Sequence, residues 1–144
     1  MINKSLQHAF NIIFLNTSLR DLPQQSIQQL LELLHEPYIF QISKGKTIIS
    51  QGQPADYIYI LLSGEGVVLN DIDWNINNTI DEVNAIDCLG ITEYLTKKRE
   101  YTGFVIAKTD CYILRIHNSE FYEILATNFD VSFSILKILV IKTV

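Results

Sequence analysis

The sequence predicts a mainly β fold with flanking helices (α+β): a small jelly roll, or double-stranded β-helix barrel, with N-terminal and C-terminal helices. Three observations predict it. Apolar residues repeat with a helical period up to about residue 36 and again after residue 117, and with a period of two between these positions. The short β-rich runs in the middle are separated by turn residues, a spacing typical of small barrels. The 144 residues, 48% of them hydrophobic, fit one domain over residues 1–144.

The N-terminal part, about residues 2–36, is expected to be helical. Apolar residues recur on one helical face across residues 2–16. A second helix can start at Pro23, because the N–H that proline lacks would be unpaired in a first helical turn. Pro37 marks the end of this helix. The apolar face of the second helix consists of Ile27, Leu30, Leu31 and Leu34.

The barrel is expected over about residues 38–117. Gly and Pro residues mark the turns at 44–46, 51–56 and 63–66, since Gly supplies a positive φ and Pro a fixed one. A polar loop is predicted at 70–79, and an irregular segment with one helical turn at 87–100. The predicted strands are 38–43, 47–50, 57–62, 67–69, 80–86, 101–108 and 111–116.

C-terminal helices are expected over about residues 118–143. Asn118 or Ser119 can cap the first of them, because its side-chain oxygen accepts a hydrogen bond from a free backbone N–H. The last helix starts near Asp130 and carries apolar residues on nearly all sides. Two interpretations stay open for it. The helix is either buried on two sides or contributes to an interface with a protein partner, which includes a homodimer.

The composition excludes several classes of protein. The net charge of −5 gives no attraction for DNA, and no basic recognition helix follows the barrel, so we expect no DNA binding. The two cysteines and three histidines share no metal-ligand spacing, and no phosphate-binding loop or nucleophile motif occurs, so we expect no enzyme, metal or cofactor. No segment resembles a signal peptide or membrane span, which predicts a cytoplasmic protein without membrane contact.

Residues 44–65 carry the most informative motif. Two glycine turns bracket a strand there, and an aromatic-rich strand ends in the corner Ser63-Gly64-Glu65. This pattern resembles the first half of the cyclic nucleotide-binding domain family, to which catabolite activators and protein kinase A regulatory subunits belong. The resemblance covers about residues 10–143. It implies a non-catalytic regulatory or sensor domain, with cyclic AMP or cyclic GMP as the ligand and signalling through the C-terminal helix.

The resemblance also implies a phosphate-binding cassette, which matches residues 83–102. In the family, backbone N–H groups of a short helix and an arginine hold the cyclic phosphate, and a Glu accepts a hydrogen bond from the ribose hydroxyl. By this match the ligand-binding residues are Gly90, Ile91, Thr92, Arg99 and Thr102.

The cassette departs from the family pattern. Ile91 stands in place of the ribose-binding Glu, Ile86 replaces the first Gly, and Tyr101 occupies a position where small residues are usual. Loss of the carboxylate alone weakens binding by about 10- to 100-fold, since a hydrogen bond to a charged group contributes roughly 1.5–3 kcal/mol. The first hypothesis is therefore a sensor that binds a cyclic nucleotide or related small anion weakly. The alternative is a degenerate fold that serves as an interaction or dimerisation scaffold.

Overall fold

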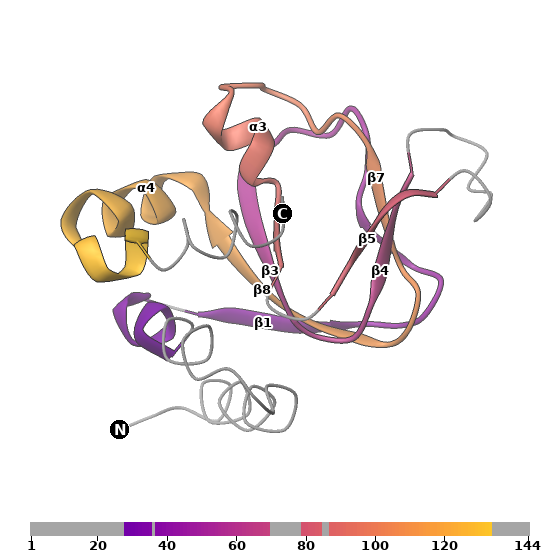
Figure 1. The fold of residues 1–144 in the computed structure, drawn as a ribbon, viewed down its shortest axis with the longest axis horizontal. Coiled ribbons are helices and arrows are strands. Elements are labelled where there is room, and N and C mark those ends of the chain that lie inside the picture. Colours follow the sequence, from indigo (N-terminus) through magenta and orange to yellow (C-terminus); the bar gives the residue numbers. More distant parts are fainter. Residues whose placement is uncertain (1–27, 36, 70–78, 85–86, 134–144) are drawn as a thin grey trace.

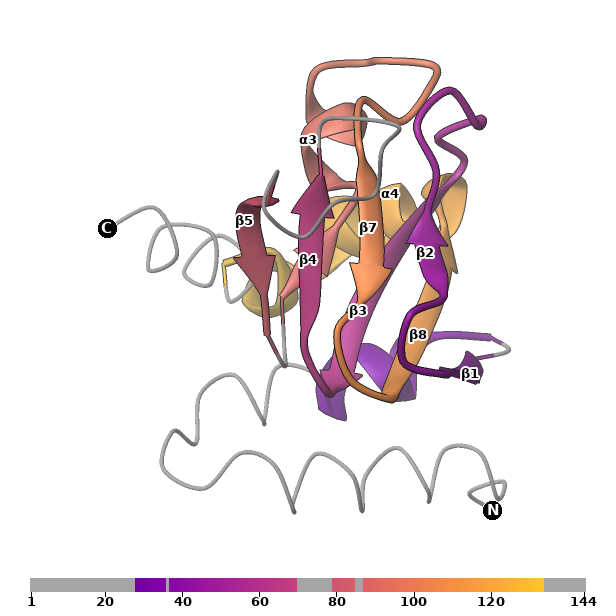
Figure 2. The same ribbon diagram turned by 90° about the vertical axis from the view of Figure 1, so that its right-hand side faces the viewer.

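The computed structural model describes residues 28–35, 37–69, 79–84 and 87–133. Two four-stranded antiparallel sheets face each other, and helices lie on the outer side of one of them (Figures 1 and 2). This arrangement confirms the mainly β jelly-roll fold with flanking helices.

The first sheet has the strand order β1-β8-β3-β6 and the second has the order β2-β7-β4-β5. The strands of the first sheet are β1 (Tyr38–Ile42), β3 (Tyr57–Ser63), β6 (Cys88–Leu89) and β8 (Cys111–His117). Those of the second are β2 (Thr47–Ile49), β4 (Gly66–Leu69), β5 (Thr79–Val83) and β7 (Phe104–Ala107). Sequence neighbours therefore often lie in different sheets, so the turns between them form the two ends of the barrel.

The central strands of the first sheet, β3 and β8, carry buried apolar residues on both faces, because each face covers a separate core. Along β3, Ile58, Ile60 and Leu62 face the helices, while Tyr59 and Leu61 face the second sheet. We call these two clusters the helix-side core and the barrel core. The near-continuous apolar run of β3 follows from this double burial.

The helix-side core joins three helical segments to the first sheet. They are residues 28–33, helix α4 (Asn118–Thr127) and residues 129–133. Leu30, Leu31 and Phe121 are at most 1% exposed, and Val131 is also buried in this cluster. Figure 1 shows α4 and the segment 28–33 on the side of β1, β3 and β8 that faces away from β4, β5 and β7.

The predicted elements agree with the structure apart from three corrections. Residues 101–103 do not belong to a strand, because the backbone of Tyr101 pairs with the turn at residues 52–53 (both N···O distances 3.0 Å). A short strand, β6, was not predicted. Helix α4 is capped by His117, whose Nδ1 accepts a hydrogen bond from the backbone N–H of Ser119 at 3.1 Å. Asn118 does not cap it, since its side chain donates to the carbonyl oxygen of Ala55.

Some sequence predictions lie outside the described residues. These are the helix at 2–16, the start of the second helix, most of the loop at 70–79, residues 85–86 of the strand predicted at 80–86, and the last helix beyond residue 133. Within the described part of the chain, no helix combines the length and hydropathy needed to cross a membrane.

Candidate ligand-binding cassette

The cassette lies where β6 leads into helix α3 (Ile91–Leu95), at one end of the barrel (Figure 1). Strand β6 pairs with β3, with Leu89 opposite Tyr59. Gly90 follows at the N-cap of α3 with a φ of +85°, a conformation that side chains disfavour. A Cβ atom there would lie 3.0 Å from the carbonyl oxygen of Tyr57 and 3.3 Å from Cε1 of Tyr101. The position therefore requires glycine both for its backbone and for its close neighbours.

Ile91 lies in the helix-side core and not towards the interior of the barrel. Its side chain is 7% exposed. On the next turn of α3, the ring of Tyr94 packs edge-on against Phe121 of α4, with 5.5 Å between the ring centroids. Helix α3 is thus anchored to α4 by apolar contacts. An isoleucine suits this position because it adds to that packing.

Tyr101 closes the space beside Gly90. Its side chain is 4% exposed and belongs to the barrel core, where its ring lies 6.4 Å from that of Tyr59. The phenolic hydroxyl donates a hydrogen bond to the carbonyl oxygen of Tyr57 at 2.6 Å. The phenolic oxygen of Tyr101 also accepts a hydrogen bond from the backbone N–H of Tyr57 at 3.3 Å. Each polar atom of the side chain is therefore satisfied inside the protein.

The burial of this tyrosine pair also affects its titration. Desolvation raises the pKa of Tyr101 well above the ordinary tyrosine value, and the neighbouring Tyr59 adds to the effect. The pKa of Tyr59 is raised as well, mainly by burial, although the positive charge of Arg115 opposes the shift. Both phenols are consequently neutral near pH 7, and Tyr101 acts as a hydrogen-bond donor.

Thr102 pairs with a carboxylate of the same cassette. The Oε1 atom of Glu93 accepts hydrogen bonds from the Thr102 hydroxyl at 2.9 Å and from the Thr102 backbone N–H at 3.3 Å. Both donors that Thr102 offers are therefore used by the chain itself. The negative charge of Glu93 also stands where an anionic ligand would approach Thr102.

Arg99 and Thr92 extend into solvent. Both residues are exposed, and the carbonyl oxygen of Arg99 accepts a hydrogen bond from Ala55 at 2.8 Å, which fixes the backbone. Of the five predicted site residues, the structure thus places Gly90 beside Tyr101 and Thr102 beside Glu93. Ile91 is in the core, and the other two lie on the surface.

The sequence interpretation missed the role of Glu93. Glu93 follows Ile91 by two positions, which on a helix turns its side chain by about 200° away from that of Ile91. The sequence therefore did not indicate that the Glu93 carboxylate reaches Thr102. The bulk of Tyr101 was visible in the sequence, but the direction of its side chain was not.

A family model described as cyclic nucleotide-binding domain matches residues 39–128, which is more than half of the chain. The chain belongs to the cyclic nucleotide-binding domain family. No curated protein sequence matches it significantly.

Solved structures share the cyclic nucleotide-binding fold at low sequence identity. The c-di-GMP-responsive global regulator CLP of Xanthomonas campestris is 13% identical, with a TM-score of 0.65 over 80% of this chain and 56% of that one. The sensor domain of the transcriptional regulator DNR from Pseudomonas aeruginosa is 17% identical, with a TM-score of 0.67 over 97% and 91%. The regulatory subunit of a cAMP-independent protein kinase A from Trypanosoma brucei is 23% identical, with a TM-score of 0.61 over 97% and 46%.

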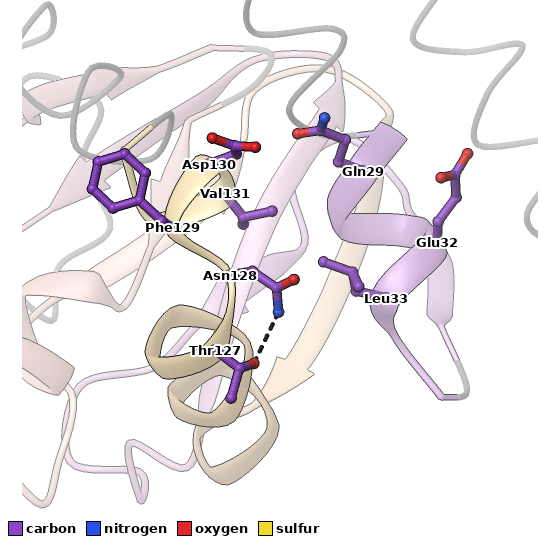
Figure 3. Close-up of a pocket in the computed structure, with 8 residues that line it drawn as sticks. All are labelled: Gln29, Glu32, Leu33, Thr127, Asn128, Phe129, Asp130 and Val131. Carbon is purple, nitrogen blue, oxygen red and sulfur yellow. Dashed lines mark hydrogen bonds between the residues drawn. The ribbon is translucent and has the colours of Figure 1, made fainter.

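A hollow of about 410 Å³ lies away from the cassette, between the helical segment 28–33 and the chain that follows α4 (Figure 3). Asn128 in this hollow donates a hydrogen bond to the Thr127 hydroxyl at 2.9 Å. Next to it, Phe129 is 77% exposed and stacks on Phe133, which is 45% exposed, with 5.8 Å between ring centroids. The helical side of the domain therefore presents an aromatic pair to solvent.

Proposed function

We propose that this chain is a non-catalytic regulatory domain that binds cyclic nucleotides only weakly and acts through contacts with a protein partner. One observation carries the proposal: Tyr101 is buried beside Gly90, with its hydroxyl bonded to the Tyr57 carbonyl. A ligand that enters the cassette has to displace this ring and break its hydrogen bond. The free energy needed to displace the ring makes the binding free energy less favourable, because only the small fraction of molecules with an open cassette can bind the ligand.

Two further observations support weak binding. Glu93 already accepts both hydrogen bonds that Thr102 can donate, so a phosphate has to compete with a tethered carboxylate. Ile91, in place of a glutamate, offers no acceptor for a ribose hydroxyl, and its side chain belongs to the helix-side core. The protein kinase A regulatory subunit from Trypanosoma brucei has the same fold and is named as cAMP-independent, which supports a regulatory role without cyclic AMP for this fold.

The same contacts suggest how the cassette communicates with the helices. Ile91 and Tyr94 attach α3 to the core that α4 shares, and Tyr94 contacts Phe121 directly. A displacement of Tyr101 that shifts Gly90 therefore also shifts the support of α4. The segment after α4 carries Phe129 and Phe133, whose exposed rings we propose as part of the contact with a second copy of the chain or another protein.

Isothermal titration with cyclic AMP and cyclic GMP tests the ligand part of this proposal. We expect weak or no saturable heat with the wild-type chain and at least tenfold tighter binding after Tyr101→Ala, which opens the cassette. Tyr112→Ala is the matched control, because this partly buried tyrosine packs on the helix-side core away from the cassette. Micromolar binding by the wild-type chain would contradict the proposal. Equal affinities of Tyr101→Ala and Tyr112→Ala would also contradict it, provided that both variants retain the native circular dichroism spectrum.

Light scattering over a range of protein concentrations tests the partner part. If a second copy is the partner, Phe129→Ala lowers the association constant, whereas Tyr122→Ala, which removes another exposed ring from α4, leaves it unchanged. A wild-type chain that stays monomeric throughout shifts the search to other proteins. Association that is insensitive to Phe129→Ala contradicts the proposed contact.

A further inference from the structure

A second hollow, of about 590 Å³, lies on the first sheet and is separate from the cassette. Strands β1, β3 and β8 supply its floor, and the start of α4 supplies one wall. The residues that define its chemistry are His35, Tyr38, Tyr57, Arg115, His117 and Glu120. Its volume falls in the range of small-molecule sites, and it is open to solvent, with Tyr38 50% exposed at its edge.

The guanidinium of Arg115 is held between two tyrosine rings. Its Cζ atom lies 4.4 Å from the ring centroid of Tyr38 and 4.3 Å from that of Tyr57. The register explains this, since Arg115 on β8 pairs with Tyr38 on β1 and with Tyr59, the second residue after Tyr57, on β3. Cation–π contacts with both rings restrict the rotation of the guanidinium.

The N–H edge of Arg115 is the part that the two rings leave open. Among the described residues no carboxylate lies within 4.0 Å of the guanidinium nitrogens, and no side chain or carbonyl accepts a hydrogen bond from them. A planar guanidinium with free edges fits the two oxygens of a carboxylate or phosphate through two parallel hydrogen bonds. The stacking provides the orientation in advance, so less side-chain entropy is lost on binding.

His117 adds a second donor to the hollow. Its Nδ1 accepts a hydrogen bond from the Ser119 backbone N–H, so the neutral ring carries its proton on Nε2. Its ring also packs edge-on against Tyr57, with 5.4 Å between the centroids. Among the described lining residues Glu120 is the one carboxylate, and its Oε1 accepts a hydrogen bond from the backbone N–H of His35 at 2.9 Å.

We infer that this hollow binds a small organic oxyanion, a carboxylic acid or a phosphate ester, with the guanidinium edge of Arg115 holding the charged group. The Nε2–H of His117 assists, and the remaining volume accommodates the rest of the ligand. The hollow contains none of Gly90, Arg99 and Thr102, so this inference can be tested whether or not the proposed function of the cassette holds.

Nuclear magnetic resonance titration of the full chain tests the inference. Inorganic phosphate and acetate are added separately at millimolar concentrations and constant ionic strength. We expect saturable shifts of the Arg115 and His117 backbone amides with at least one probe. Saturation with phosphate alone identifies phosphate esters as the ligand class, and saturation with acetate alone identifies carboxylic acids.

Two variants and one control make the test specific. Arg115→Lys keeps the charge but loses the planar guanidinium, and it should lower the affinity for the probe by about tenfold or more. Tyr38→Leu removes one of the two rings that contact Arg115 and should lower the affinity by about two- to fivefold. The second variant provides an independent test if the lysine variant folds poorly. Lys44→Arg changes an exposed cation in the turn after β1, outside both the hollow and the cassette, and should have no effect. Absence of saturation with both probes, shifts that survive Arg115→Lys, or shifts lost only in Lys44→Arg overturn the inference.

Discussion

The hydroxyl of Tyr101 donates a hydrogen bond to the carbonyl oxygen of Tyr57 across 2.6 Å, in a part of the cassette that is nearly closed to solvent. This bond joins the loop after α3 to strand β3, 44 residues earlier in the chain. It holds the tyrosine ring over Gly90 and gives the cassette its closed form.

Tyr101→Phe should destabilise the protein slightly while leaving the cassette closed. The phenyl ring still fills the space, but the Tyr57 carbonyl loses a buried donor, which costs about 1 kcal/mol. Thermal unfolding followed by circular dichroism should show a decrease in Tm of about 2–4 °C. An unchanged Tm would mean that water or another donor satisfies the Tyr57 carbonyl equally well.

Gly90→Ala should be more destabilising than Gly45→Ala. The two glycines have nearly the same φ, +85° and +86°, so an alanine incurs the same backbone strain, about 1–2 kcal/mol, at each position. Only at Gly90 does the added Cβ meet neighbours, the rigid Tyr57 carbonyl at 3.0 Å and the Tyr101 ring at 3.3 Å, whereas Gly45 has nothing within 4 Å. Denaturant unfolding gives the loss of unfolding free energy for each variant, and the difference isolates the contribution of the contacts. We expect the loss at Gly90 to be larger by about 1 kcal/mol or more. Equal losses would show that the neighbours move aside freely.

Glu93 and Thr102 should be energetically coupled. A double-mutant cycle of Glu93→Ala and Thr102→Val should give a coupling free energy of about 0.5–1 kcal/mol, a modest value because the pair is partly exposed and its hydrogen bonds compete with water. Chemical denaturation supplies the four stabilities. The matched cycle of Glu123→Ala with Thr102→Val should be additive, since the side chain of Glu123 does not reach Thr102 in the described structure. A coupling near zero in the first cycle would contradict the pairing.

The stability of the domain should fall at high pH. The pKa values of Tyr101 and Tyr59 are raised in the folded state, chiefly by burial, so the folded chain keeps these protons to a higher pH than the unfolded chain. Their contribution is complete below about pH 10, the ordinary tyrosine pKa, and is lost as the pH rises above it. Unfolding free energies across this range should decrease, and Tyr101→Phe should reduce the slope. An identical slope in the variant would assign the loss to other groups.

Local patterns predicted most of the fold. The alternation in residues 38–42 and the glycine turns placed the strands within a few residues, because these signals depend on neighbours in the sequence. Long-range pairing caused the misses. The sequence predicts one strand over residues 101–108, yet the backbone of Tyr101 pairs with the turn at residues 52–53 and the strand begins at Phe104. Likewise, Asn118 donates hydrogen bonds from its side chain to the carbonyl of Ala55 and from its backbone N–H to the carbonyl of Asp56. His117 therefore caps the helix instead.

The cassette was less predictable than the fold, because side-chain directions decide its chemistry. The sequence shows an isoleucine after Gly90 but not that α3 buries its side chain in the helix-side core. The same limit applies to Glu93, whose carboxylate reaches Thr102 only through the path of the loop between them. The resemblance therefore predicts the segment, and the packing of α3 determines what its residues contact.

Tyr57 contributes to both regions of the first sheet. Its backbone carbonyl holds Tyr101 in the cassette, and its ring covers one face of Arg115 in the second hollow. A ligand that moves Tyr57 in one region would therefore alter the other region as well. By thermodynamic reciprocity, ligands of the two regions would then change each other's affinity by the same factor.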